Sequence, residues 1–138
     1  MTNSPRRYAM NYSWVWGPDN RDLDKTASLA MTLRDAPPGQ FAPLLRDWLG
    51  SLQSDDATSG NYYEGGYGVW ILDRDDRGAR IIFTSGGQDV ADSLGYGVEK
   101  FYEQVLQPLT EGAVTWTELP LETPRDTSGG TPLDPPLG

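Results

Sequence analysis

The sequence predicts an α+β fold, with a mainly antiparallel sheet of five strands and two helices. Five segments have the apolar patterns of strands, and two others repeat apolar side chains with the period of a helix. Their order along the chain is ββαββαβ. This order contains the β-α-β-β-α-β arrangement of a ferredoxin-like core, which serves many functions and therefore does not decide this one.

The first two strands are expected over residues 8–16 (YAMNYSWVW) and 26–34 (TASLAMTLR). Strict alternation places five large side chains of the first strand on one face: Tyr8, Met10, Tyr12, Trp14 and Trp16. The second segment has a helical alternative, since Ala, Leu and Met favour helices, but its alternation and its two threonines favour a strand. We expect these strands to form a hairpin across the polar loop between them.

Two amphipathic helices are expected. In the first, apolar residues fall at i, i+3, i+4, i+7, i+8 and i+11: Phe41, Leu44, Leu45, Trp48, Leu49 and Leu52. The second has its apolar stripe within residues 98–109: Val98, Phe101, Tyr102, Val105, Leu106 and Leu109. Gly95 and Gly97 precede this stripe and are expected to delay the start of the second helix.

Residues 67–73 (YGVWILD) and 79–85 (ARIIFTS) have nearly continuous apolar character, which predicts two central strands. Between them, the charged run Asp73–Gly78 partly matches a calcium loop. Arg77 and Thr84, however, stand where such a loop needs ligand oxygens. We therefore expect a hairpin turn that faces water, with Gly78 at positive φ.

The fifth strand is expected over residues 113–119 (AVTWTEL), which alternate again. From Pro120 onward the chain has five prolines, no aromatic residue and no apolar period. We expect one α+β domain over residues 1–119 and a disordered, Pro/Gly-rich tail over residues 120–138.

The chain contains no cysteine and no histidine. This composition excludes disulfides, thiolate zinc sites, cysteine nucleophiles and Ser-His-Asp hydrolysis. Any metal would need oxygen ligands. We expect no metal, no cofactor and no catalytic residue. The chain also has no apolar stretch near the roughly 20 residues that span a bilayer, and its start lacks the apolar region of a signal peptide. We therefore expect a cytoplasmic protein that binds no membrane.

The acidic residues are unevenly distributed. Residues 1–84 hold 11 acidic and 9 basic residues, whereas residues 85–138 hold 9 acidic and 2 basic residues. The second portion therefore carries −7 of the net charge of −9. Such a field repels nucleic acid and attracts basic partners, although an acidic surface is also common in soluble proteins without a specific role.

The expected partner-binding residues come from two segments. The acidic candidates are Asp89, Asp92, Glu99 and Glu103, and the aromatic candidates are Tyr62, Tyr63 and Tyr67. Tyrosines are enriched where proteins bind one another, although this segment could instead lead into a strand and cover the sheet edge. TSGGQD (84–89) has no phosphate-binding fingerprint and is expected to connect a strand to a helix. If the chain were catalytic, Glu64 and Glu118 would be the first carboxylates to test.

These observations favour a small acidic cytoplasmic domain of the inhibitor or immunity-protein type, which blocks a basic or nucleic-acid-directed partner protein. Two alternatives stay open. One is a structural or assembly subunit of a phage or secretion particle that docks through the tail. The other is an enzyme or small-ligand domain that uses the helix-free face of the sheet. The partner's identity and the oligomeric state do not follow from the sequence.

Overall fold

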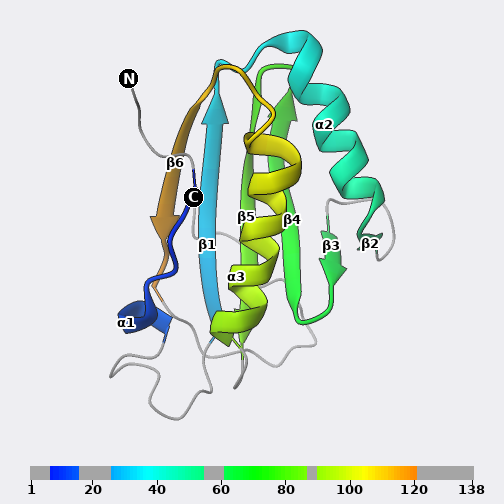
Figure 1. The fold of residues 1–138 in the computed structure, drawn as a ribbon. Helices are drawn as coiled ribbons and strands as arrows, with labels where there is room; N and C mark the ends of the chain where they lie inside the picture. Colours follow the sequence, from blue (N-terminus) through cyan, green and yellow to red (C-terminus); the bar gives the residue numbers. More distant parts are fainter. Residues whose placement is uncertain (1–6, 16–25, 55–60, 87–89, 121–138) are drawn as a thin grey trace.

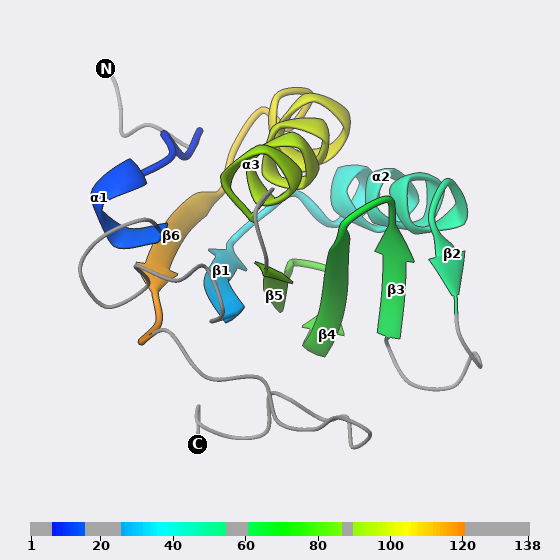
Figure 2. The same ribbon diagram turned by 90° about the horizontal axis from the view of Figure 1, so that it is seen from below.

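The fold is α+β, with an open antiparallel sheet of six strands that carries two long helices on one face (Figures 1 and 2). The structure is a computed structural model and describes residues 7–15, 26–54, 61–86 and 90–120. The strands are β1 (Thr26–Arg34), β2 (Gln53–Ser54), β3 (Asn61–Glu64), β4 (Tyr67–Asp75), β5 (Gly78–Gly86) and β6 (Ala113–Glu118). The helices are α1 (Tyr12–Val15), α2 (Pro38–Gly50) and α3 (Val90–Phe101), and a π-helical turn over Tyr102–Leu106 continues α3.

The strands lie in the order β2-β3-β4-β5-β1-β6. Four expected strands (26–34, 67–73, 79–85 and 113–119) are confirmed as β1, β4, β5 and β6, and the helix over 41–52 is confirmed as α2. The expected number of five strands is wrong, because Gln53–Ser54 and Asn61–Glu64, which were not expected to be strands, form β2 and β3. Gly65, with φ 57°, turns the chain between β3 and β4, so the Gly-Gly pair in NYYEGGYG marks a hairpin.

The expected strand over residues 8–16 is wrong for residues 8–15, and Trp16 lies outside the described residues. Residues 12–15 form the single turn of α1, in which the backbone N–H of Trp14 donates to both the carbonyl and the side-chain oxygen of Asn11. Asn is a favoured residue before a helix, and here its side chain competes successfully with strand pairing. The place expected for this strand beside β1 is taken by β5 and β6, which pair with β1 on its two edges.

The start of the second helix is also corrected. α3 begins at Val90 and includes both Gly95 and Gly97. Gly97 lies where the ring of Tyr67 packs against α3, and a Cβ at this position would collide with that ring. The glycine therefore allows close packing of α3 on β4 instead of delaying the helix.

Aromatic side chains join the two helices to the sheet. Trp48 of α2 lies with its ring centroid 4.7 Å from that of Phe101 of α3, and Phe83 of β5 lies 5.4 Å from Phe101. All three side chains are buried. The indole N–H of Trp48 is buried and has no hydrogen-bond partner among the described residues, which lowers the benefit of this otherwise well-packed contact.

The hairpin between β4 and β5 turns at Asp76 and Arg77, as the sequence indicated. Gly78 does not adopt positive φ, so that expectation is wrong. A Cβ at Gly78 would instead collide with the carbonyl oxygen of Leu33 on the neighbouring strand. Glycine is needed here because two backbones approach closely. Asp73 forms an ion pair with Arg80, and Asp75 accepts the backbone N–H of Arg77, so two carboxylates of the charged run stabilise the hairpin itself.

Candidate functional site

The site that best combines the expected acidic residues with aromatic side chains lies between α3 and residues 8–12. We call it the tyrosine hollow. It has a volume of about 320 Å³ and is lined chiefly by Tyr8, Met10, Tyr12, Asp92, Tyr96 and Glu99. Two of these residues, Asp92 and Glu99, are expected partner-binding residues. The helical spacing of seven places them on the same side of α3.

Arg7 binds Glu99 beside the hollow. The Nε and Nη2 atoms of Arg7 donate to the two carboxylate oxygens of Glu99, at 3.0 and 2.7 Å. The guanidinium also lies 5.5 Å from the ring centroid of Tyr102. The hydrogen bonds and charge of Glu99, and to a smaller extent the charge of the nearby Glu103, raise the pKa of Arg7 above its ordinary value. The chain thus already shows an arginine bound to a carboxylate of α3 and close to a ring of the π-helical turn that continues α3.

A second cation lies over a ring of the hollow itself. The ammonium group of Lys100 is 5.7 Å from the ring centroid of Tyr96, and Tyr96 is 51% exposed. Tyr12 is 55% exposed. Tyrosine rings attract cations through their negative faces, and Lys100 shows this attraction at Tyr96.

Glu118 of β6 holds residues 8–11 in place. It accepts a hydrogen bond of 2.6 Å from the hydroxyl of Tyr8 and one of 3.1 Å from the side-chain amide of Asn11. Partial burial, followed by this bond to Glu118, raises the pKa of the Tyr8 hydroxyl well above its usual value of 10. Tyr8 is therefore a neutral donor at ordinary pH, and Glu118 is engaged in positioning one wall of the hollow.

The expected tyrosine surface is divided between different parts of the fold. Tyr62 lies toward α2, the exposed Tyr63 points to the opposite face of the sheet, and Tyr67 is buried under α3. Strand alternation separates Tyr62 from Tyr63, since neighbouring residues of a strand point to opposite faces. Tyr67 donates a 2.8 Å hydrogen bond to Glu64, and burial and this bond raise the pKa of its hydroxyl.

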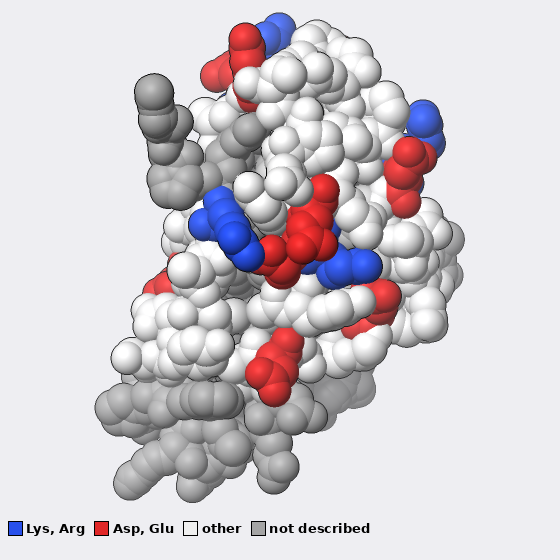
Figure 3. Space-filling view, viewed as in Figure 1, with Lys and Arg blue, Asp and Glu red and all other residues white. Residues whose placement is uncertain are grey.

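The acidic candidates are likewise distributed. Asp92 is exposed and Glu99 half-buried on α3, whereas Glu103 is exposed on the π-helical turn that continues α3. Asp89 lies outside the described residues. Acidic and basic side chains alternate over the helix-bearing face instead of forming one continuous acidic patch (Figure 3). The described residues include 11 acidic and 7 basic side chains, so they hold −4 of the net charge of −9.

Sequence reasoning did not single out Tyr12 and Tyr96 as site residues. Tyr12 was assigned to an apolar strand face, and Tyr96 stands between two glycines that were expected to precede the helix. A tyrosine between two glycines, four residues after Asp92, is the signal that could have identified Tyr96. Tyr12 had no comparable signal, because its partners on α3 are about 80 residues away in the sequence.

Among the described side chains, no three acidic residues come together as a metal site would require. No helix of the described part is long and apolar enough to cross a bilayer. Comparison with known protein families, with curated proteins and with solved structures finds no match to this chain. Inference about its role therefore relies on the geometry of its own surface.

Proposed function

We propose that this chain is a small acidic protein-binding domain, an antagonist that blocks a basic or nucleic-acid-directed partner protein. The tyrosine hollow is the observation that carries this proposal. Ring faces and carboxylates both attract cations, and in the hollow they converge around a space that suits one lysine or arginine side chain. The role is binding and not catalysis.

Asp92 and Glu99 can both accept hydrogen bonds from a lysine or arginine of the partner. Asp92 is exposed and makes no ion pair with another described residue. Glu99 uses its two oxygens to accept two bonds from Arg7, whereas an ionised carboxylate offers about four lone-pair sites. A partner cation would bind Asp92 directly and share Glu99 with Arg7.

The negative net charge of the whole chain also favours a basic partner protein. A net charge of −9 attracts basic surfaces over roughly a Debye length and accelerates their encounter. Specificity would come from the exposed rings of Tyr12 and Tyr96, since aromatic side chains supply large contact areas with little loss of conformational entropy.

We further propose that the scaffold is a ferredoxin-like core extended at one edge. The order β1-α2-β4-β5-α3-β6 along the chain, together with the order β4-β5-β1-β6 across the sheet, supports this interpretation. β2 and β3 would then be additions outside β4. The tyrosine hollow, beside α3, lies at the other end of the helix layer from β2 and β3.

The test uses the immobilised full chain and an extract of the organism that encodes it, at about 50 mM and about 500 mM salt. We expect one stoichiometric basic protein at low salt and its loss at high salt. The captured protein is then titrated against Asp92→Asn and Tyr96→Ala variants, and each should weaken binding at least about tenfold, the usual effect at an interface hot spot.

Asp47→Asn provides the matched control. Asp47 is a highly exposed residue of α2, and its replacement removes the same charge far from the hollow. We expect this variant to bind nearly as well as the wild type. Equal losses for Asp92→Asn and Asp47→Asn would contradict a specific role of the hollow, and capture of no basic protein at low salt would contradict the proposed function.

A further inference from the structure

A second hollow lies at the other edge of the helix layer, between α2 and the strands β2, β3 and β4. We call it the arginine groove. It has a volume of about 670 Å³, within the range of small-molecule sites. Its lining includes the apolar side chains of Leu45, Leu49 and Leu52 and the side chain of Tyr62. It shares no residue with the tyrosine hollow.

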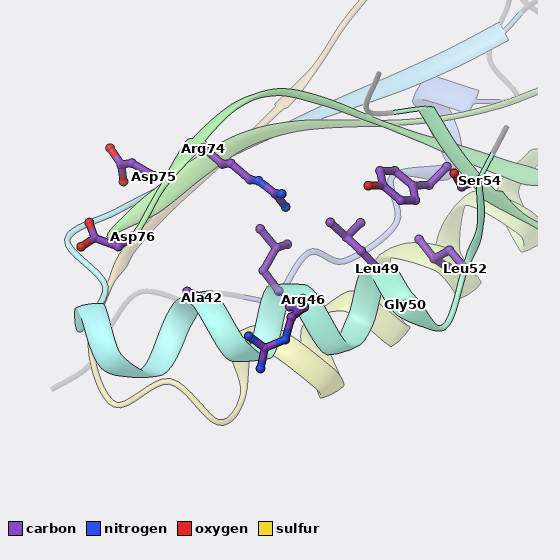
Figure 4. Close-up of a pocket in the computed structure, with 11 residues that line it drawn as sticks. Ala42, Arg46, Leu49, Gly50, Leu52, Ser54, Arg74, Asp75 and Asp76 are labelled. Atoms are coloured by element: carbon purple, nitrogen blue, oxygen red, sulfur yellow. The ribbon is translucent and has the colours of Figure 1, made fainter. Parts of the chain in front are cut away.

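The charged groups around this groove are asymmetric. Arg74 extends from β4 into the space above α2, whereas Asp75 and Asp76 point away from it and Arg46 points outward from α2 (Figure 4). Arg74 forms no ion pair with another described residue. The groove therefore presents one guanidinium that has no ion-pair partner among the described residues, beside an apolar surface.

Strand geometry explains why Arg74 faces this way. Ile71 pairs with Ile81 and Asp73 pairs with Arg80, so Leu72 is an extra residue that shifts the register of β4. Beyond this irregularity, Arg74 pairs with Ala79, which is buried with the helix-side core. Arg74 consequently lies on the helix-bearing face, and Asp73 pairs with Arg80 on the opposite face.

We propose that the arginine groove binds small amphipathic carboxylates. The apolar body of such a ligand would lie along the partly exposed side chains of Leu52 and Tyr62, next to the buried Leu45 and Leu49. Its carboxylate would accept hydrogen bonds from Arg74. A guanidinium is suited to this role because it can donate two parallel hydrogen bonds to a carboxylate. This binding is independent of the protein partner proposed above, since the two hollows share no lining residue.

The proposal is tested by NMR titration of the full chain with sodium octanoate, and with 1-octanol as an uncharged ligand of the same length. We expect saturable shifts confined to α2 and β2–β4, with a dissociation constant on the order of 1 mM for so small a ligand in an open groove. Arg74→Gln should weaken octanoate binding about five- to tenfold and leave octanol binding unchanged.

Arg80→Gln is the matched control, because Arg80 lies on the neighbouring strand with its side chain on the opposite face. It should leave octanoate binding unchanged. Ala42→Trp provides a second variant, since Ala42 is exposed on α2 and lines the groove, so a larger side chain should block both ligands. Equal effects of Arg74→Gln and Arg80→Gln, or shifts outside the groove, would overturn the proposal.

Discussion

The tyrosine hollow and the arginine groove lie at opposite edges of the helix layer, one beside α3 and the other beside α2, and they are built differently. The tyrosine hollow joins residues 8–12 to residues 91–99, so it depends on contacts between distant parts of the chain. The arginine groove is built within residues 42–76, from α2 and the strands that follow it. The tyrosine hollow should therefore be lost when residues 8–12 no longer contact α3, whereas the arginine groove should persist. Variants can test this difference.

The largest expected effect concerns the core that supports both sites. Trp48→Ala removes the side chain that packs between α2 and α3, and we expect the free energy of unfolding to fall by about 3–5 kcal/mol. Chemical denaturation measures this loss. Trp48→Phe should cost much less, because it keeps an aromatic ring and removes the unpartnered N–H. Similar losses for the two variants would show that the indole N–H contributes to stability after all.

A pair of glycines on α3 gives the next largest effect. Gly97→Ala should destabilise the fold by about 1–3 kcal/mol, because the new methyl group would collide with the ring of Tyr67. Gly95→Ala should instead be neutral or stabilise by up to about 1 kcal/mol, since its Cβ would meet only Met10 at 3.7 Å and alanine favours helices. Thermal denaturation of both variants tests the packing of α3 on β4. Equal stability of the two would contradict it.

Glu118→Ala tests whether the two sites differ in their dependence on docking. The variant removes the acceptor of the bonds from Tyr8 and Asn11, and we expect a loss of about 1 kcal/mol. Amide hydrogen exchange should increase over residues 7–15 and remain unchanged in α2. Glu111→Ala is the control, because Glu111 is exposed and forms no ion pair with another described residue. Faster exchange in α2 as well would show that the sites are coupled.

The smallest expected effect appears at alkaline pH. The pKa values of the Tyr8 and Tyr67 hydroxyls are raised in the folded protein, so the unfolded chain releases these protons first as pH rises. Stability should therefore be retained below the unfolded value of about 10 and decline above it. Tyr8→Phe and Tyr67→Phe should each make this decline less steep in denaturation experiments at increasing pH. An unchanged decline would contradict the assignment to these two hydroxyls.

Several elements were predictable because their pattern is local. β1, β4, β5, β6 and α2 show apolar side chains at the period of a strand or helix, and the buried faces follow directly. The helical period also places Asp92 and Glu99 on the same side of α3, but only the structure shows that α3 begins at Val90 and includes both residues. By contrast, residues 8–16 alternate like a strand, but Asn11 initiates a helical turn and β1 is paired on both edges by other strands.

The α+β class, the buried faces of the main elements, the acidic charge and the lack of thiol and imidazole chemistry all follow from the sequence alone. The strand order, the division of the tyrosines between faces and the two surface hollows follow from the folded structure. The two groups of features differ in the range of the interactions that produce them. Periodicity records which side of an element avoids water, whereas strand pairing, the Arg7–Glu99 bond and the collision that requires Gly97 depend on residues brought together from distant parts of the chain.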